Sequence, residues 1–337
     1  MSLRTAGGSQ AVGYDSPVAP IQPSKTVSAI VPVYNSAATL PMLVDRLGAS
    51  LQPLVSDFEI VLVNDASRDD SWSVIEQLSR CNPCVRGIDL ARNQGQHNAL
   101  LCGFRAARFE IIITLDDDLQ HRPEEIARLL EKLEDGYDVV YGARKAEGHG
   151  LLRNVASRIT KIALQTAMGA ETAETLSPFR AVRASVCRAF ASYQGPYVNI
   201  DVLLTWGTTR FGAVQVTHAQ RETGASNYTV RLLLRHALNM ITGFSTLPLK
   251  LASLMGFVFT AFGMLVLAFV LIRYVISGGG TPGFPFLASI IAIFSGAQLF
   301  ALGMIGEYLA RMHFRLMDQP AYVVRGTTLP LHEEDAI

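Results

Sequence analysis

Two long stretches without a charged residue constrain the fold of this chain more than any other feature. They run from Leu251 to Ile272 and from Phe284 to Gly306. As α-helices each would be about 33–35 Å long, close to the roughly 30 Å hydrocarbon core of a bilayer. A pair of buried core helices is the alternative. Because only a short segment separates the two runs, we expect residues 250–310 to form a two-helix transmembrane hairpin.

Basic residues lie unevenly around this hairpin and predict its orientation. Arg273 alone stands between the two runs. The flanks carry more cations, namely Arg231, Arg235 and Lys250 before the first run and Arg311 and Arg315 after the second. Cytoplasmic flanks of membrane helices are enriched in lysine and arginine. We therefore expect both ends of the hairpin, and the chain before it, to lie in the cytoplasm.

The chain before the hairpin alternates strand-like and helix-like segments from residue 25 onward. The strand-like segments are rich in β-branched residues and cover residues 26–34, 58–65, 84–91, 110–117 and 137–144. Repeated β-α units predict an α/β fold with a doubly wound, mostly parallel sheet of the Rossmann type. Ligands of such sheets bind at the carboxyl ends of the strands. Asn35 or Ser36 is expected to cap the first helix.

The remaining segments divide the chain further. Residues 1–24 are rich in Ser, Gly, Ala and Pro, which predicts a flexible N-terminal tail. Two basic amphipathic segments, 151–168 and 228–244, are expected to lie in the lipid headgroup plane, with ordinary packing helices as the alternative. After the N-terminal tail, the sequence predicts a cytosolic catalytic domain at 25–229 and a juxtamembrane amphipathic helix at 230–249. The hairpin follows at 250–310, and a cytosolic C-terminal tail at 311–337.

Three consecutive aspartates, Asp116 to Asp118, follow the fourth predicted strand. In an extended chain, side chains two residues apart leave on the same face, so Asp116 and Asp118 converge while Asp117 points away. Two adjacent carboxylates are costly unless a cation lies between them. Oxygen ligands suit Mg²⁺ or Mn²⁺, and Gln120 can add a neutral oxygen. Asp116, Asp118 and Gln120 therefore form a predicted metal site, with an acidic turn before the next helix as the alternative.

Several function classes lack their signatures in this sequence. The formal net charge is zero, so no basic field for nucleic acid is expected. No glycine-rich dinucleotide fingerprint and no Walker sequence follow a predicted strand, which argues against an oxidoreductase and against an NTPase. Three arginines are the candidates for phosphate contact instead: Arg144, Arg180 and Arg221.

Seven motifs follow one another in residues 25–325. They are AIVPVYN, VLVNDASRDDS, LARNQGQHNALLCGF, LDDDLQHRPEE, VVYGAR, RETGASNY and, at the end of the second apolar run, GMIGEYLARM. Taken in order, these motifs resemble those of the GT-A-fold family 2 glycosyltransferases. The branch they resemble uses polyprenyl phosphates as acceptors, and includes dolichol-phosphate mannose synthase, GtrB-type glucosyltransferases and ArnC-type aminoarabinose transferases.

This resemblance implies roles for individual residues. The nucleotide of a UDP- or GDP-sugar would contact Pro32, Tyr34, Asn35, Asp65 and Asp116. A divalent ion against the diphosphate would be held by Asp116, Asp118 and Gln120.

The acceptor side of the implied site involves other residues. Arg144 would face phosphate, and Arg221 with Ser226 would receive the phosphate of the acceptor lipid. The implied catalytic set is Asp116, Asp118 and Arg221. Many hexose-transferring relatives carry Asp where Pro178 stands, which favours an amino or deoxy sugar as the transferred group.

The implied reaction is an inverting sugar transfer to polyprenyl phosphate, undecaprenyl phosphate in bacteria, at the inner membrane, for envelope glycan or lipid modification. A phosphate monoester has a second pKa of about 6 and is already a dianion at neutral pH, so no strong general base is required. A polysaccharide synthase-like enzyme and a non-catalytic nucleotide-sugar-binding subunit are the alternatives. Small residues in the second run, Ala297 and Ala301, favour helix–helix packing and leave a homo-oligomer open.

Overall fold

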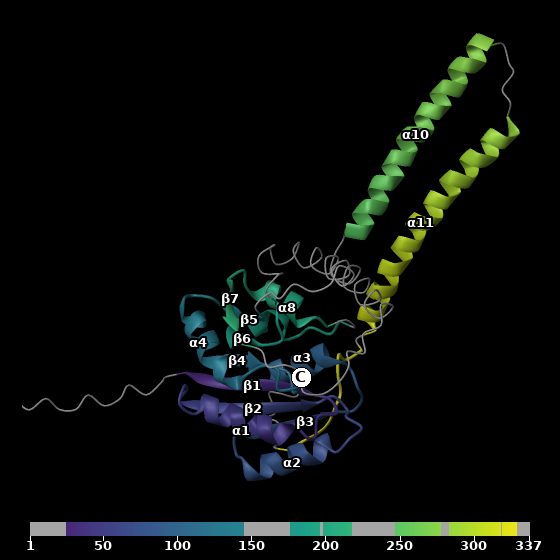
Figure 1. Cartoon of the computed structure of the whole chain (residues 1–337). Coiled ribbons are helices and arrows are strands. Elements are labelled where there is room, and N and C mark those ends of the chain that lie inside the picture. The colour runs from purple at the N-terminus through teal and green to yellow at the C-terminus, as the bar shows by residue number, and fades with distance from the viewer. Residues whose placement is uncertain are drawn as a thin grey trace, which may run out of the picture.

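In the computed structural model, a sheet flanked by helices is joined to two long helices that project away from it (Figure 1). The structure describes residues 25–144, 176–195, 198–217, 247–277, 283–317 and 319–328. The two predicted amphipathic segments therefore lie outside the described residues.

Four parallel strands form the centre of the sheet. They are β1 (Thr26–Val33), β2 (Asp57–Asn64), β3 (Val85–Leu90) and β4 (Ile111–Thr114). β1 pairs with both β2 and β4, and β2 pairs with β3, all in parallel. The helices that connect them are α1 (Leu40–Leu51), α2 (Ser71–Cys81) and α3 (Gln96–Ala106). This part of the chain confirms the predicted alternation of strand and helix.

Four further strands extend the sheet on both sides. They are β5 (Val139–Arg144), β6 (Arg180–Arg183), β7 (Phe211–Val216) and β8 (Val324–Thr327). The order across the sheet is β7-β5-β6-β4-β1-β2-β3-β8. β6 runs antiparallel to β4 and β5, and β8 runs antiparallel to β3. The sheet is therefore mostly parallel, as expected, but three of its strands were not predicted from the sequence.

Both faces of the sheet are covered, which explains why the central strands are apolar on both sides. One apolar cluster joins the sheet to α1, to Ile75 of α2 and to α4 (Ile126–Glu134), which follows the short helix η1 (Pro123–Glu125). The other cluster joins it to α3 and to three shorter helices. These are α7 (Ala184–Cys187), η2 (Arg188–Phe190) and α8 (Ile200–Gly207).

The first helix begins later than its expected cap. α1 starts at Leu40 with Thr39 at the N-cap position, and no side chain caps it. The carbonyl of Ser36 instead accepts the amide of Thr39 at 3.0 Å, so a turn separates the strand end from the helix. The expectation that Asn35 or Ser36 caps this helix is wrong. That turn keeps both residues at the edge of the sheet, where the candidate site lies.

The two projecting helices are α10 (Leu247–Ser277) and α11 (Phe284–Leu316). Each contains a segment long and apolar enough to cross a membrane, Leu249–Arg273 and Ile293–Ala310. Their apolar side chains are largely exposed; Phe257, for example, is 74% exposed. Arg273 belongs to α10, whereas the sequence suggests the connecting loop. The expected pair of long apolar helices is present.

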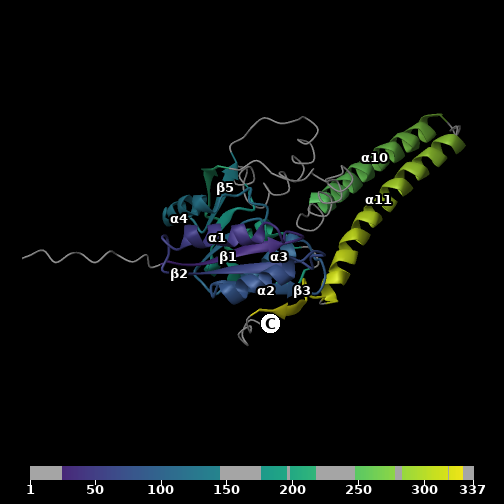
Figure 2. The same ribbon diagram turned by 60° about the horizontal axis from the view of Figure 1, so that its bottom comes forward.

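After the second long helix the chain returns to the sheet. β8 pairs with β3 in the register Ile88 to Thr327 and Asp89 to Gly326. In Figure 2 this strand, drawn in yellow, lies beside β3. Part of the segment that the sequence assigns to a C-terminal tail is therefore an edge strand of the sheet. It also covers the edge of β3 that would otherwise be open for pairing.

A glycine sets the distance between α3 and the central strand. A Cβ added at Gly103 would lie 2.3 Å from Cγ2 of Ile30, a fully buried residue of β1. The helix backbone therefore approaches the sheet more closely than any other residue would allow. This placement matters because α3 begins at the edge where the three aspartates lie.

We expect Gly103→Ala to lower the free energy of unfolding by about 1–3 kcal/mol, since the new methyl group forces α3 away from β1. Gly48, inside α1, is the matched control, because a Cβ added there would have no atom within 4 Å. Gly48→Ala should stabilise the protein by up to about 1 kcal/mol through its higher helix propensity. Denaturant unfolding of the full-length protein in detergent measures both. Equal effects of the two substitutions would contradict the close packing of α3.

Candidate active site

The candidate site lies where β1, β2 and β4 end side by side. Val33 is opposite Asn64 in the β1–β2 pair, and Ile30 is opposite Thr114 in the β1–β4 pair. The ladder continues one residue further, because the amide of Asp65 donates to the carbonyl of Val33 at 2.9 Å. The carboxyl ends of these parallel strands therefore bring together the residues that the sequence predicted as a site.

Asp117 points toward the loop between β1 and α1. Its Oδ2 accepts the backbone amide of Tyr34 at 3.0 Å, and its carbonyl accepts the hydroxyl of Thr39 at 2.8 Å. Burial raises the pKa of Asp117, and its hydrogen bonds, including those to Ser36 and Tyr34, oppose that rise. The middle carboxylate of the three thus holds a loop in place. Asp117 and Asp118 lie in a turn after β4, so the alternation expected for an extended segment does not extend to them.

Asp116 and Asp118 have different neighbours. The side-chain amide of Gln96, in the first turn of α3, donates to Oδ1 of Asp116 at 2.5 Å. Oδ1 of Asp118 accepts the backbone amide of Gln120 at 3.1 Å across a tight turn in which Leu119 has φ 60°. Gln96 was missing from the sequence prediction, although its place just after the carboxyl end of β3 is where a ligand-facing residue is expected.

The carboxylate charges crowd one another at this strand end. The pKa of Asp116 is raised to about 7, first by burial and then by the charges of Asp118 and Asp117. Arg180 and the hydrogen bond from Gln96 lower it and only partly offset the rise. A carboxylate whose ionised form is disfavoured by a neighbouring carboxylate gains stability when a cation binds beside it. The donor chemistry of Asp116 and Asp118 therefore fits a divalent metal ion.

In the described part of the chain, few side chains could coordinate a metal ion beside Asp116 and Asp118. Among the described residues there is no group of three or more His, Cys, Asp and Glu side chains that could enclose a metal ion. A site with one or two carboxylates leaves coordination positions for phosphate oxygens and water, which is how Mg²⁺ is usually held in enzymes that bind nucleotides. The arrangement suits an ion that binds together with a phosphorylated substrate.

The loops after β1 and β2 are bound to each other. The amide of Asn35 donates to Oγ of Ser67 at 3.0 Å, and Oδ1 of Asn35 accepts the amide of Arg68 at 2.7 Å. Asn35 has φ 54°, a backbone conformation that asparagine tolerates better than most residues. Tyr34 is 44% exposed at this edge, whereas Pro32 is buried within β1. Of these predicted nucleotide contacts, Tyr34 and Asn35 are exposed at this edge, whereas Pro32 is not.

Asp65 holds the next loop along the edge. Its two carboxylate oxygens accept the amides of Gln94 and Gly95 at 2.7 and 2.8 Å. Gly95 has φ 90°, in the region that favours glycine, and it immediately precedes α3. Burial raises the pKa of Asp65, and the two amides oppose the rise. Asp65 thereby fixes the start of α3 and, with it, the position of Gln96.

Arg180 lies beneath the aspartates. Its guanidinium is buried, donates to the hydroxyl of Thr114 at 3.0 Å and pairs with Asp201. The hydroxyl of Tyr141 donates to the same carboxylate at 3.0 Å. The suggestion that Arg180 contacts phosphate directly is therefore wrong, because its charge is already paired inside the protein. Its partner Asp201 carries no local sequence signal and was not predicted.

Three of the predicted residues cannot be placed at the site. Arg144 is the last residue of β5, and its side chain is outside the described part of the structure. Arg221 and Ser226 lie outside the described residues altogether. The half of the site predicted to receive the acceptor therefore remains a prediction.

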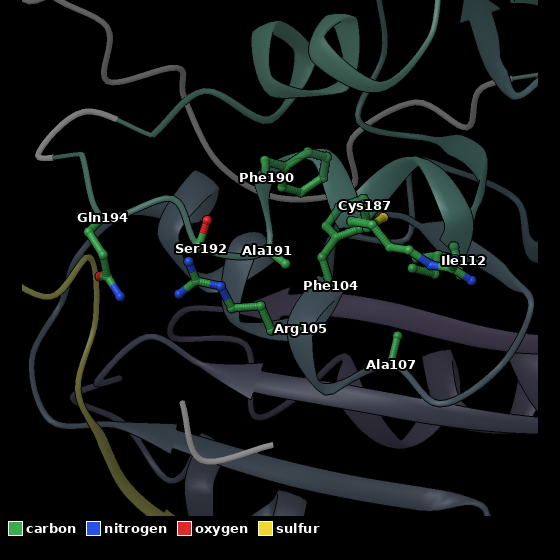
Figure 3. A pocket seen from close by; sticks show the side chains of 11 residues that line it. Phe104, Arg105, Ala107, Ile112, Cys187, Phe190, Ala191, Ser192 and Gln194 are labelled. Atoms are coloured by element: carbon green, nitrogen blue, oxygen red, sulfur yellow. The ribbon is translucent and has the colours of Figure 1, made fainter. Parts of the chain in front are cut away.

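A cavity of about 440 Å³ lies elsewhere in the domain (Figure 3). Its wall includes Phe104, near the end of α3, and Ile112, near the start of β4, so it is at the opposite end of the strands from the aspartates. The other residues that line it are Arg105, Ala107, Ala184, Cys187, Arg188, Phe190, Ala191, Ser192 and Gln194. None of the predicted site residues contributes to this cavity.

Known proteins are similar in sequence to this chain over most of its length. The model of the family described as glycosyl transferase family 2 matches residues 28–191. The undecaprenyl-phosphate 4-deoxy-4-formamido-L-arabinose transferase of Serratia proteamaculans is 34% identical over 311 residues, which cover 90% of this chain and 94% of the relative. The enzyme of the same name from Pseudomonas savastanoi pv. phaseolicola is 36% identical over 306 residues, 90% of each chain.

Among solved structures, Mycobacterium tuberculosis glucosyl-3-phosphoglycerate synthase matches 65% of this chain and 78% of its own, at 18% identity and a TM-score of 0.48. The assignment depends on the two transferases, whose similarity covers 90% of this chain. With relatives of this identity spanning nearly its whole length, and with the family model matching the part that carries the aspartates, the chain belongs to the family 2 glycosyltransferases.

Proposed function

We propose that this protein transfers a sugar from a nucleotide-sugar to polyprenyl phosphate, undecaprenyl phosphate in a bacterial cell. The observation that carries the proposal is a pair of crowded carboxylates, Asp116 and Asp118, at a strand-end edge in a chain that also has two long exposed apolar helices. The names of the two transferase relatives support undecaprenyl phosphate as the acceptor.

The donor side of the site follows from the aspartates. Asp116 and Asp118, with Gln120, would hold Mg²⁺ or Mn²⁺ against the diphosphate of a UDP- or GDP-sugar. When bound, such an ion neutralises the negative charge that builds on the leaving diphosphate. Tyr34 and Asn35 at the exposed edge, with the buried Pro32 and Asp65 behind them, would line the nucleotide pocket. The interlocked loops around these residues support a preformed pocket.

The acceptor side requires an anion site and no general base. A lipid monophosphate is already a dianion at neutral pH and can attack the anomeric carbon in line, which inverts it. Arg221 and Ser226 would receive this phosphate, with Arg144 facing phosphate nearby. Arg221 would thereby be part of the catalytic set with Asp116 and Asp118.

The transferred sugar is proposed to be an amino or deoxy sugar. Its support is twofold: the relatives are named for a 4-deoxy-4-formamido-L-arabinose, and Pro178 stands where an acidic residue is common in hexose transferases. The carbonyl of Pro178 accepts the hydroxyl of Thr114, the last residue of β4, at 2.6 Å. This bond places Pro178 beside the end of the strand that leads to the aspartates.

The proposed location is the cytoplasmic face of the inner membrane. β8, which follows the second apolar helix, belongs to the same sheet as the strands before the first one. This pairing supports a hairpin whose two ends lie on the same side of the membrane as the catalytic domain. The distribution of lysine and arginine around the hairpin supports the cytoplasm as that side.

Membranes that contain the protein should convert undecaprenyl phosphate to a glycolipid when given Mg²⁺ or Mn²⁺ and the correct member of a panel of nucleotide sugars. Asp118→Ala should reduce the rate at least about 100-fold, because the charge on the leaving group is then less well stabilised. Asp117→Ala is the matched control and should cost less, since that carboxylate faces the loop after β1. Activity that survives chelation by EDTA, or a labelled soluble polymer in place of glycolipid, would refute the proposal.

The raised pKa of Asp116 predicts how metal binding depends on pH. Its pKa is about 7 in the folded protein against 3.8 in the unfolded chain, so the folded state holds the extra proton between these values. The stability that Asp116 contributes is therefore largest below the unfolded pKa and is lost as pH rises through the folded pKa. Ionised Asp116 binds cations best, so Mn²⁺ should raise the unfolding temperature more at about pH 8 than at about pH 5.

Asp116→Asn should abolish this pH dependence, because asparagine does not titrate, and should weaken the stabilisation by Mn²⁺. Thermal unfolding of the full-length protein in detergent, with and without Mn²⁺ at the two pH values, measures both effects. An equal shift at both pH values in the unmodified protein would show that Asp116 does not bind the ion.

A further inference from the structure

The segment that follows the second long helix contacts β3 at the point where β3 leads into the candidate site. The amide of Ala91 donates to the carbonyl of Val323 at 2.8 Å, and Nη2 of Arg325 donates to the carbonyl of Ala91 at 2.6 Å. Both backbone groups of Ala91 are thus held by the C-terminal segment. Ala91 lies immediately after β3, before the loop that carries Gln94 and Gly95.

Arg325 also pairs with a carboxylate that is nearly buried. Its Nη1 lies 3.4 Å from Oδ2 of Asp89, whose side chain is 6% exposed, whereas that of Arg325 is 61% exposed. Within the described residues, Arg325 is the basic partner that the structure gives to Asp89. A buried charge without a counter-charge is costly, so the position of Asp89 depends on Arg325.

Asp89 connects Arg325 to the loops of the candidate site through hydrogen bonds. Its Oδ1 accepts the side-chain amide of Asn64 at 2.7 Å, and Oδ1 of Asn64 accepts the amide of Ser67 at 3.3 Å. Oγ of Ser67 in turn accepts the amide of Asn35 at 3.0 Å. Four hydrogen-bonded or ionic contacts therefore join the C-terminal segment to the loop that presents Tyr34.

The same segment follows directly from the membrane hairpin. α11 ends at Leu316 and β8 begins at Val324, so only residues 317–323 separate them. At about 3.3–3.6 Å per extended residue, this linker spans no more than about 25 Å. The strand that carries Arg325 can therefore pair with β3 only when the catalytic domain lies next to the base of α11.

We propose that Arg325 is a positioning residue for the nucleotide-sugar donor, so that the donor site is complete only when the C-terminal segment is docked. Through Asp89 and Asn64 it fixes the loops after β1 and β2, and through the carbonyl of Ala91 it holds the start of the loop after β3. Arg325 touches neither substrate and acts mainly through Asp89. This inference rests on the proposed function, which places the donor at these loops. Donor binding would then depend on the C-terminal segment, which connects the catalytic domain to the membrane helices.

The test uses the full-length protein in detergent or nanodiscs and titrates UDP and GDP in the presence of Mn²⁺. Arg325→Ala should weaken binding of the nucleotide that the unmodified protein binds by about tenfold, a coupling typical of residues that act through a network. In the transfer assay the KM for the donor should rise by a similar factor. The kcat and the KM for the lipid acceptor should change by less than about threefold, because Arg325 contacts neither the reacting atoms nor the acceptor.

Two controls separate positioning from a general effect on the fold. Arg80→Ala removes another exposed arginine, which lies 4.0 Å from Glu76 on α2, and should leave nucleotide binding unchanged. Asp89→Asn keeps an oxygen acceptor for Asn64 but removes the charge that Arg325 neutralises. In that background Arg325→Ala should weaken nucleotide binding much less than tenfold, because the contact with Asp89 is already absent and only the hydrogen bond to the carbonyl of Ala91 remains to be lost.

Three results would overturn the inference. They are unchanged nucleotide binding in Arg325→Ala, a tenfold loss that persists in the Asp89→Asn background, and an equal loss in Arg80→Ala. If the unmodified protein bound neither nucleotide with any divalent ion, the proposed function itself would fail, and this inference with it. Unchanged binding in Arg325→Ala beside normal binding in the unmodified protein would overturn the inference alone.

Discussion

Crowding of carboxylate charge at the end of β4 is the constraint on which the rest of the site depends. A fully buried strand delivers three aspartates to one edge of the sheet, where burial and mutual repulsion raise the pKa of Asp116 to about 7. Asp117 instead accepts hydrogen bonds from the amide of Tyr34 and the hydroxyl of Thr39 in the neighbouring loop. A bound cation would relieve the charge that remains on Asp116 and Asp118, and it would also attract a diphosphate to this place.

The polar residues at the other strand ends serve mainly to hold the loops around this charge. Asp65 binds the amides that precede α3, which places Gln96 against Asp116. Asn35 links the loops after β1 and β2. Because each loop is hydrogen-bonded to its neighbour, the edge is organised before any substrate binds, and preorganisation of this kind reduces the entropy lost on binding.

Much of this arrangement could be predicted from the sequence, because it depends on local patterns. Apolar β-branched runs located β1 to β5, and the spacing of the aspartates predicted that Asp117 differs from its neighbours. Two long runs without a charged residue identified the long apolar helices. The missing parts depend on contacts between distant segments. β8 has only four residues, Val324–Thr327, and becomes a strand by pairing with β3. The burial of Arg180 depends on Asp201, 21 residues further along the chain.

The central claim is that Asp116 and Asp118 hold a divalent ion against the diphosphate of the donor. Electron–nuclear double resonance of Mn²⁺ bound to the full-length protein, with UDP or GDP present, tests it most directly. The claim predicts a protein-bound Mn²⁺ that shows phosphorus hyperfine coupling, which is lost in Asp118→Asn and kept in Asp117→Asn. Bound Mn²⁺ without phosphorus coupling, or coupling that survives Asp118→Asn unchanged, would contradict it.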